Sequence, residues 1–88
     1  MDLHSYREQI DKVDDELLRL FKDRMEIARK IGFYKKVNNL PIYNSARENE
    51  KLAEITQKAG GELNSYARRL FETLFELSRA YQEELSNE

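Results

Sequence analysis

Apolar and aromatic residues recur in alternating steps of four and three along the first third of the chain. The repeat comprises Tyr6, Ile10, Val13, Leu17, Leu20, Arg24, Ile27, Ile31 and Tyr34. Such spacing is typical of a helix with one packed seam, in which Arg24 is the exception. A capping box, Ser5-x-x-Glu8, marks its start, and the segment 38–41 (Asn-Asn-Leu-Pro) ends it, because Pro disfavours helix in the residue before it. The pattern predicts a helix over residues 5–37.

Two shorter helices are predicted in the rest of the chain. A second capping box, Ser45-x-x-Glu48, begins a helix over residues 46–59, which Gly60 and Gly61 end. Asn64 can cap a third helix, which is followed by a polar tail at 86–88. Its inward face comprises Ala67, Leu70, Phe71, Leu74, Phe75, Ser78, Tyr81, Gln82 and Leu85. With three Gly and one Pro to break the chain, the expected fold is all-α, with three helices in a single domain over residues 1–88.

The first predicted helix is too long for a compact chain of this size. At 1.5 Å per residue it extends over roughly 50 Å, whereas a compact domain of this length is roughly 25 Å across. The two shorter helices can therefore cover only part of its seam. Each Leu or Ile left exposed would forgo about 1.5–3 kcal/mol of burial. We therefore expect an intertwined homodimer of six helices that share one core.

The composition excludes several classes of function. With 15 Lys and Arg against 17 Asp and Glu, the net charge of −2 offers no footprint for nucleic acid or an anionic membrane. Cysteine is absent, which excludes disulfides and thiolate chemistry, and His4 cannot form a metal site by itself, so we expect no metal. The first residues lack the apolar core of a signal peptide, and no run approaches the roughly 18 apolar residues of a membrane span. We expect a cytoplasmic protein.

Four polar side chains lie on stripes that are otherwise apolar. Arg24 and Lys35 are eleven residues apart, which places them only about 20° apart around a helix axis. Ser78 and Gln82 follow one another at a spacing of four on the inward face of the third helix. Because burying polar groups without partners costs several kcal/mol, these four residues are candidates for one functional site in the interior.

Structural explanations for the same residues stay open. The two cations could extend toward solvent or pair with helix carboxylates such as Glu72 or Glu76. The serine and the glutamine could join helices through core hydrogen bonds.

Three further charged residues have a structural and a functional interpretation. Glu48 could cap a backbone N–H as the third residue of its capping box, and Arg47 could simply be solvated. Arg7 lies about 100° around the helix from Arg24, so it cannot easily share a site with Arg24 within one chain. In a dimer it could reach the site of the partner.

Five segments spread over nearly the whole chain carry a family resemblance. They are residues 6–18 (Tyr-Arg-Glu-Gln-Ile-Asp-Lys-Val-Asp-Asp-Glu-Leu-Leu), 23–28 (Asp-Arg-Met-Glu-Ile-Ala), 31–35 (Ile-Gly-Phe-Tyr-Lys), 40–48 with Leu-Pro-Ile-Tyr and Ala-Arg-Glu, and 70–82 with Leu-Phe, Ser78 and Gln82. In this order and spacing they resemble the all-α (AroQ-type) chorismate mutase family, although no single segment is specific.

The resemblance implies a cofactor-free enzyme of aromatic amino acid biosynthesis, in the shikimate pathway, that rearranges chorismate to prephenate. Arg24, together with Arg7 of the other subunit, would bind the two substrate carboxylates. Lys35 and Gln82 would donate hydrogen bonds to the ether oxygen of the breaking bond. These catalytic and substrate-binding roles are expectations that follow from the family.

The resemblance also implies roles for the remaining site residues. Ser78 would hold the ring carboxylate, Glu48 and the backbone at Asn44 would contact the ring hydroxyl, Arg47 would line the pocket, and Ile31 and Phe75 would form its apolar walls. Family members often carry Asp at the position of Asn44. The substitution would weaken a side-chain role there but leave a main-chain contact intact.

Three other functions are compatible with the sequence. An isochorismate-pyruvate lyase of the same family would use a similar helical pocket. A helical dimerisation module would explain the seam but would leave the interior polar residues as unrelated accidents. A regulatory domain of a fused shikimate-pathway enzyme is the third alternative.

Overall fold

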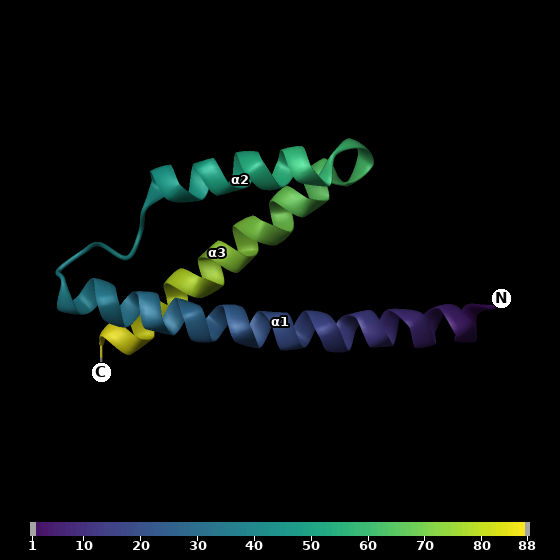
Figure 1. The fold of residues 1–88 in the computed structure, drawn as a ribbon, viewed down its shortest axis with the longest axis horizontal. Helices are drawn as coiled ribbons and strands as arrows, with labels where there is room; N and C mark the ends of the chain where they lie inside the picture. Colours follow the sequence, from purple (N-terminus) through teal and green to yellow (C-terminus); the bar gives the residue numbers. More distant parts are fainter. Residues whose placement is uncertain (1, 88) are drawn as a thin grey trace.

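Three α-helices and one short 3-10 helix make up residues 2–87, the part of the chain that the computed structural model describes (Figure 1). The helices are α1 (Leu3–Val37), α2 (Ser45–Ala59) and α3 (Asn64–Ser86), with η1 (Gly61–Leu63) between the last two. Residues 2–87 contain no strand. The prediction of an all-α chain with one long and two shorter helices is confirmed.

The first turns of α1 and α2 are capped differently from the prediction. The side chain of Asp2 accepts a hydrogen bond from the backbone N–H of Ser5 at 2.9 Å, so α1 begins before the predicted capping box. Likewise, Asn44 accepts from the backbone N–H of Arg47 at 3.1 Å, and Ser45 is already helical. Both predicted capping boxes are therefore wrong, because a competent cap residue stands just upstream of each.

The connections between the helices follow the predicted breaks. After α1, Asn39 adopts a positive φ of 55°, a conformation that Asn tolerates better than most residues. Gly60 ends α2 with a φ of 62°. Asn64, in contrast, does not cap α3 as predicted: it is the first helical residue, and its side-chain amide donates to the carbonyl oxygen of Thr56 at 3.3 Å. The amide thereby joins the start of α3 to the last turn of α2.

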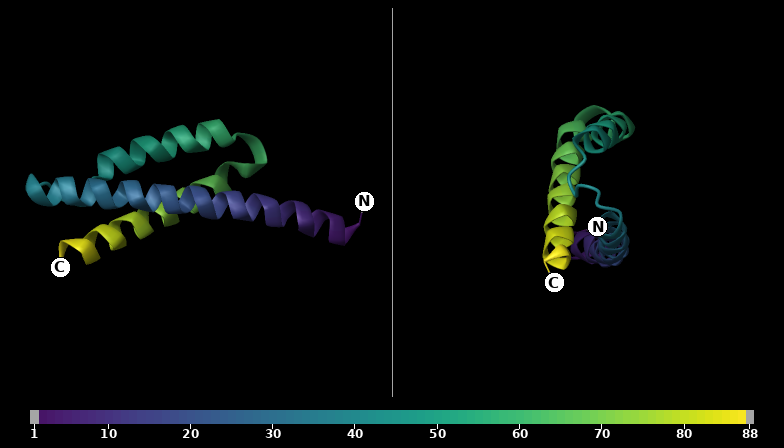
Figure 2. Two further views of the ribbon diagram at one scale, coloured as in Figure 1. Left: turned by 60° about the horizontal axis from the view of Figure 1, so that its bottom comes forward. Right: turned by 90° about the vertical axis from the view of Figure 1, so that its left-hand side faces the viewer.

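Helix α3 holds the other two helices together. It packs against both α1 and α2, which make hardly any direct contact with each other. The end-on view in Figure 2 shows α3 alongside both, with α2 near one end and α1 near the other. The crossing of α1 and α3 is close because Gly32 is buried there, and a Cβ on Gly32 would lie 2.9 Å from Cγ of Gln82.

The interior of the single chain is very small. Among residues 2–87, the buried apolar side chains are Ala28, Leu52 and Phe75. The radius of gyration is 16.1 Å, against about 12 Å for a compact chain of this length. The chain is accordingly long and flat, with extents of 54 × 28 × 14 Å.

The first half of α1 leaves its apolar seam uncovered. It projects beyond the other helices, and the amino terminus lies at its far end (Figure 1). The exposed seam residues of this half are Tyr6, Ile10, Val13, Leu17 and Leu20, each more than half accessible. No helix within residues 2–87 combines the length and the apolar character needed to cross a membrane.

Candidate active site

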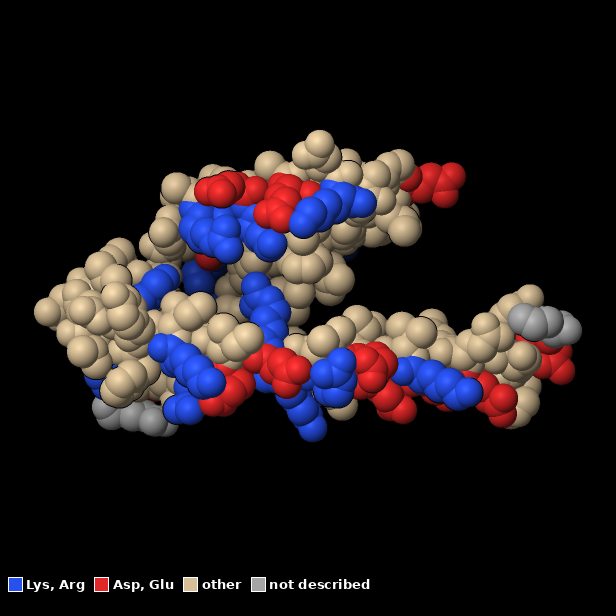
Figure 3. Space-filling view, in the orientation of Figure 1, with Lys and Arg blue, Asp and Glu red and all other residues tan. Residues whose placement is uncertain are grey.

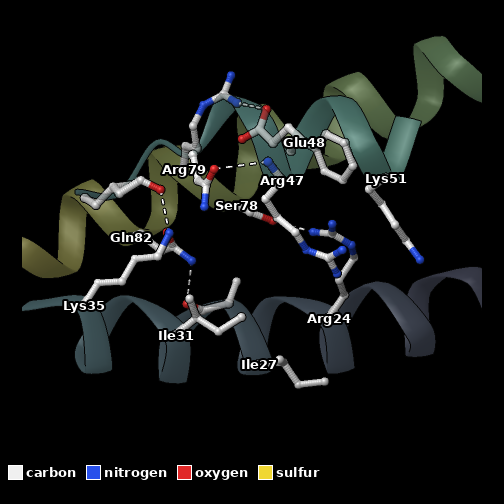
Figure 4. A pocket seen from close by; sticks show the side chains of 14 residues that line it. Arg24, Ile27, Ile31, Lys35, Arg47, Glu48, Lys51, Ser78, Arg79 and Gln82 are labelled. Atoms are coloured by element: carbon white, nitrogen blue, oxygen red, sulfur yellow. Dashed lines mark hydrogen bonds and ion pairs between the residues drawn. The ribbon is translucent and has the colours of Figure 1, made fainter. Parts of the chain in front are cut away.

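A cavity of about 470 Å³ lies between α1, α2 and α3 (Figure 4). Its lining comprises Arg24, Ile27, Ala28, Ile31, Lys35, Ile42, Asn44, Arg47, Glu48, Lys51, Phe75, Ser78, Arg79 and Gln82. All candidate site residues predicted from the sequence line it except Arg7. Each of the three helices contributes polar groups to the one space, as does the connection before α2.

Arg24 enters the cavity from α1 and is held by α3. Its guanidinium donates a hydrogen bond to Oγ of Ser78 and lies 5.5 Å from the centre of the Phe75 ring. Burial lowers the pKa of Arg24 from its ordinary value, and the charge of Glu48 offsets part of that effect. The serine is fixed in turn, because its hydroxyl donates to the carbonyl oxygen of Leu74 at 2.9 Å. The guanidinium is thus held in a defined position, and it keeps further N–H donors for a ligand.

Lys35 lies on the same face of α1, three turns further along. Its ammonium donates to the carbonyl oxygen of Ile42 at 2.7 Å, which ties α1 to the connection before α2. An ammonium has three donors, so this bond leaves two N–H groups for a ligand. Neither Lys35 nor Arg24 pairs with Glu72 or Glu76, the carboxylates of the structural alternative.

Gln82 is the buried polar residue of the cavity, with 6% of its surface exposed. Its side-chain amide donates to the carbonyl oxygen of Ala28 at 2.9 Å, across the contact between α3 and α1. The predicted alternative of a hydrogen bond between helices is therefore realised. The amide carries two N–H groups, however, and the bond to Ala28 fixes the plane in which the second one points.

Glu48 extends from α2 to α3 rather than capping its own helix. Its carboxylate pairs with the guanidinium of Arg79, a residue that the sequence analysis did not select. The backbone N–H of Glu48 bonds to the carbonyl oxygen of Asn44 at 3.1 Å. The alternative of a capping role for the carboxylate is thus wrong, and the paired side chain lines the cavity instead.

Further residues from all three helices and from the connection before α2 complete the wall of the cavity. Asn44 uses its side chain to cap α2, so its side-chain oxygen is already engaged with the backbone. Arg47 is exposed beside it. Lys51, one turn further along α2, contacts Glu54 at 3.5 Å, and the sequence analysis did not select it either. Ile31 and Phe75 provide apolar lining, as expected for the walls.

The cavity is strongly cationic although the chain as a whole is slightly acidic. Among residues 2–87, its lining contains five Lys or Arg side chains and one carboxylate, whereas the net charge of the whole chain is −2. Figure 3 shows Lys and Arg side chains in the gap between α1 and the upper helices, and mixed charges along the outer side of α1. A concave site lined by one sign of charge attracts ligands of the opposite sign.

Arg7 is the predicted site residue that the single chain does not bring to the cavity. It lies on the projecting half of α1 and is exposed. The 17 residues that separate it from Arg24 correspond to roughly 26 Å along the helix axis. No group of three or more His, Cys, Asp or Glu side chains within residues 2–87 could hold a metal ion.

The arrangement can bind a small molecule with two anionic groups. Guanidinium and ammonium groups on α1 and α2 suit carboxylates, and a fixed amide offers a neutral donor between apolar walls. Fold and cavity together define an all-α protein with a cationic cavity between its helices. Residues 6–83 match the family described as chorismate mutase type II, and the chain belongs to this family.

Similar proteins are much longer than this chain. It is 41% identical over 54 residues to the bifunctional chorismate mutase/prephenate dehydratase of Aquifex aeolicus, covering 61% of this chain and 15% of that protein. It is 35% identical over 80 residues to the 3-dehydroquinate dehydratase of Pyrobaculum aerophilum, covering 91% and 24%. A bifunctional chorismate mutase/prephenate dehydratase of Buchnera aphidicola is 34% identical over 89 residues, covering 98% and 23%. The chain thus spans less than a quarter of the length of these relatives. No solved structure matches it.

Proposed function

We propose that this chain is a chorismate mutase, which rearranges chorismate to prephenate. The observation that carries the proposal is the convergence of Arg24, Lys35 and Gln82 from two helices on one cavity. Family membership supports the proposal, since residues 6–83 match the chorismate mutase type II family. The substrate is a dianion, which suits a cationic cavity of this kind.

The reaction is a concerted rearrangement in which a C–O bond breaks as a C–C bond forms. It needs neither a nucleophile nor a proton transfer. The first contribution of the enzyme is to hold the substrate in the compact conformer that reacts, which replaces a conformational search by positioning. Arg24 would grip one carboxylate, and Ser78, to which it is bonded, would contact the ring carboxylate. Planar guanidinium groups suit this task because they bind carboxylates in a bidentate manner.

The second contribution is to stabilise the transition state electrostatically. Negative charge develops on the ether oxygen as the C–O bond breaks, and fixed donors aimed at that oxygen lower the barrier. Lys35 has N–H groups beyond the one that bonds to Ile42, and Gln82 has one beyond that bonded to Ala28. We assign these free donors to the ether oxygen. The bonds already present hold both side chains in place, so little reorganisation is needed during the reaction.

The α2 side of the cavity would recognise the ring hydroxyl. Glu48 would accept a hydrogen bond from this hydroxyl, and the backbone at Asn44 would contact it. The side chain of Asn44 caps α2, so a main-chain contact is the one that fits. Arg47 would line the cavity, with Ile31 and Phe75 against the apolar part of the substrate ring.

We further propose that the functional unit is a homodimer. The uncovered seam of the first half of α1 would become the shared core, since each of its large apolar residues gains about 1.5–3 kcal/mol on burial. Arg7, which is remote from the cavity of its own chain, would enter the cavity of the partner and bind the second carboxylate. Analytical ultracentrifugation should give the mass of two chains at micromolar concentration, and a folded monomer would contradict the proposal.

Incubating the purified protein with chorismate, and identifying the product, tests the function. Conversion to prephenate is expected. A parallel incubation with isochorismate separates the mutase from the lyase of the same family, because the lyase releases salicylate and pyruvate. If chorismate is left unchanged, the chain is not a mutase by itself.

A further inference from the structure

Arg79 is a cavity residue that the proposed function has not yet used. It follows Ser78 on α3, and its guanidinium reaches across to the carboxylate of Glu48 on α2. Both side chains are largely shielded from solvent, with 28% and 21% of their surfaces exposed. Water screens such a partly shielded ion pair between two helices less than it screens an exposed pair within one helix, so the two charges interact more strongly.

A third element fixes Arg79 in this position. Its guanidinium carbon lies 4.7 Å from the centre of the Tyr43 ring, in the connection before α2. The hydrogen bond to Glu48 raises the pKa of Arg79 above its ordinary value, against a smaller effect of burial. Arg79 and Glu48 also line a second, polar cavity of about 210 Å³. The pair thus lines both cavities, and Figure 4 shows it at the edge of the larger one.

The charge of Glu48 needs compensation if the cavity binds a dianion. A carboxylate in the wall repels both carboxylates of such a ligand, and the repulsion grows as water is displaced. A guanidinium bonded to one carboxylate oxygen offsets this charge. The other oxygen is left free to accept a hydrogen bond.

Building on the proposed function, we infer that Arg79 is a positioning residue for substrate binding. It holds the Glu48 carboxylate in the cavity wall and offsets its charge, so that the free oxygen can accept the ring hydroxyl. Arg79 itself does not contact the substrate. Its removal therefore acts through Glu48, and the effect should depend on whether Glu48 carries a charge.

A double-mutant cycle measured by steady-state kinetics with chorismate tests this inference. Arg79→Leu should raise KM by about tenfold with a smaller change in kcat, because an unpaired carboxylate remains in the site. In the background of Glu48→Gln, the same substitution should change KM by less than about twofold. Arg79→Lys keeps the charge but loses the planar stacking on Tyr43, and its KM should lie between those of wild type and Arg79→Leu.

Controls separate this effect from general ones. Arg29→Leu removes a guanidinium that pairs with Glu26 outside the cavity, and it should leave KM unchanged. Circular dichroism verifies the helical content of each variant, and Arg79→Gln replaces Arg79→Leu if the latter does not fold.

Equal changes in KM in both backgrounds would overturn the inference, since Arg79 would then attract the substrate directly. Wild-type protein that leaves chorismate unchanged would overturn the proposed function, and with it the role of Arg79. An active wild type with additive effects would overturn the role of Arg79 alone.

Discussion

Arg24 occupies a position of the α1 seam at which the pattern calls for an apolar side chain. The structure accommodates the charge through the hydroxyl of Ser78 and the ring of Phe75, and burial lowers the pKa of Arg24 from its ordinary value. A half-buried cation without a carboxylate partner in direct contact loses part of its hydration, which costs free energy. An anionic ligand would supply that partner, which fits the proposed role of Arg24 in substrate binding.

Replacing either of the two α1 cations should abolish most of the activity. Arg24→Ala and Lys35→Ala are each expected to lower kcat by at least about a hundredfold, because one fixed donor typically contributes about 10²–10³ in kcat. Steady-state assays of chorismate loss measure the effect. Circular dichroism should show that the helices are intact. Arg29→Ala, on the outer side of the same helix, is the matched control and should retain normal turnover. Wild-type rates in either cavity variant would remove that residue from the mechanism.

The neutral amide of Gln82 predicts a specific pH dependence. Because an amide does not titrate, this donor is present at every pH, and wild-type activity should not require acid. Gln82→Glu should be slow at neutral pH and faster as the pH falls, since only the protonated carboxyl can donate a hydrogen bond. Burial and the adjacent carbonyl of Ala28 both favour the protonated form, which brings this recovery within reach of mildly acidic pH.

A pH–rate profile of wild type and variant checks this expectation. Gln82→Met, which lacks a donor at any pH, should remain slow throughout. A flat profile for Gln82→Glu would contradict a donor role for position 82.

The polar residues that interrupt an apolar stripe could be predicted as site residues from the sequence, and they line the cavity. Arg24, Lys35, Ser78 and Gln82 were recognisable because helical periodicity defines where an apolar residue belongs. Arg79 and Lys51, in contrast, do not interrupt an apolar stripe. Their positions on α3 and α2 are ordinary for solvated cations, and only the packing of α2 against α3 brings them to the cavity. A single sequence carries no local signal for a contact of that kind.

The lengths of the helices were predicted well, and their caps were not. Periodicity and the breaks at Pro41 and Gly60 define the elements to within a few residues. At the amino-terminal ends, however, two adjacent residues can each serve as the cap, as with Asn44 and Ser45. The chosen cap depends on which residue adopts extended backbone, and tertiary structure decides this.

At the level of the elements, Gly32 determines how closely α1 and α3 approach. Gly32→Ala would place a Cβ 2.9 Å from Cγ of Gln82, so the helices must separate or the glutamine must move. We expect a loss of about 1–3 kcal/mol in the free energy of unfolding and a larger proportional loss of activity. Denaturant unfolding and kinetics measure the two effects. Unchanged turnover would show that the position of Gln82 is not set by this contact.

For the whole molecule, the shared site of the proposed dimer can be tested by mixing inactive chains. Arg7→Ala and Lys35→Ala should each be nearly inactive. When they are mixed and allowed to exchange, each heterodimer contains one site with both residues intact. Random pairing then restores about a quarter of the wild-type activity, measured as chorismate turnover. No recovery would show that Arg7 does not act in the partner's site.

The size of the first helix was the strongest indication of association in the sequence. The structure supports that argument as far as one chain can, since the seam from Tyr6 to Leu20 is exposed and the chain is 54 Å long. Which surfaces meet in a dimer does not follow from periodicity, because one stripe can pair in several registers. The position of Arg7 in a second cavity is for that reason drawn from the family resemblance.

The scarcity of contacts between α1 and α2 means that a bound molecule becomes part of the scaffold. A ligand that contacts Arg24 on α1 and Arg47 on α2 would bridge two helices that are otherwise connected mainly through α3 and through the bond from Lys35 to Ile42. Occupancy should therefore raise the melting temperature and slow amide exchange in α2 more than in the distant half of α1. In this protein, binding of the substrate would at the same time make the arrangement of α1 and α2 more rigid.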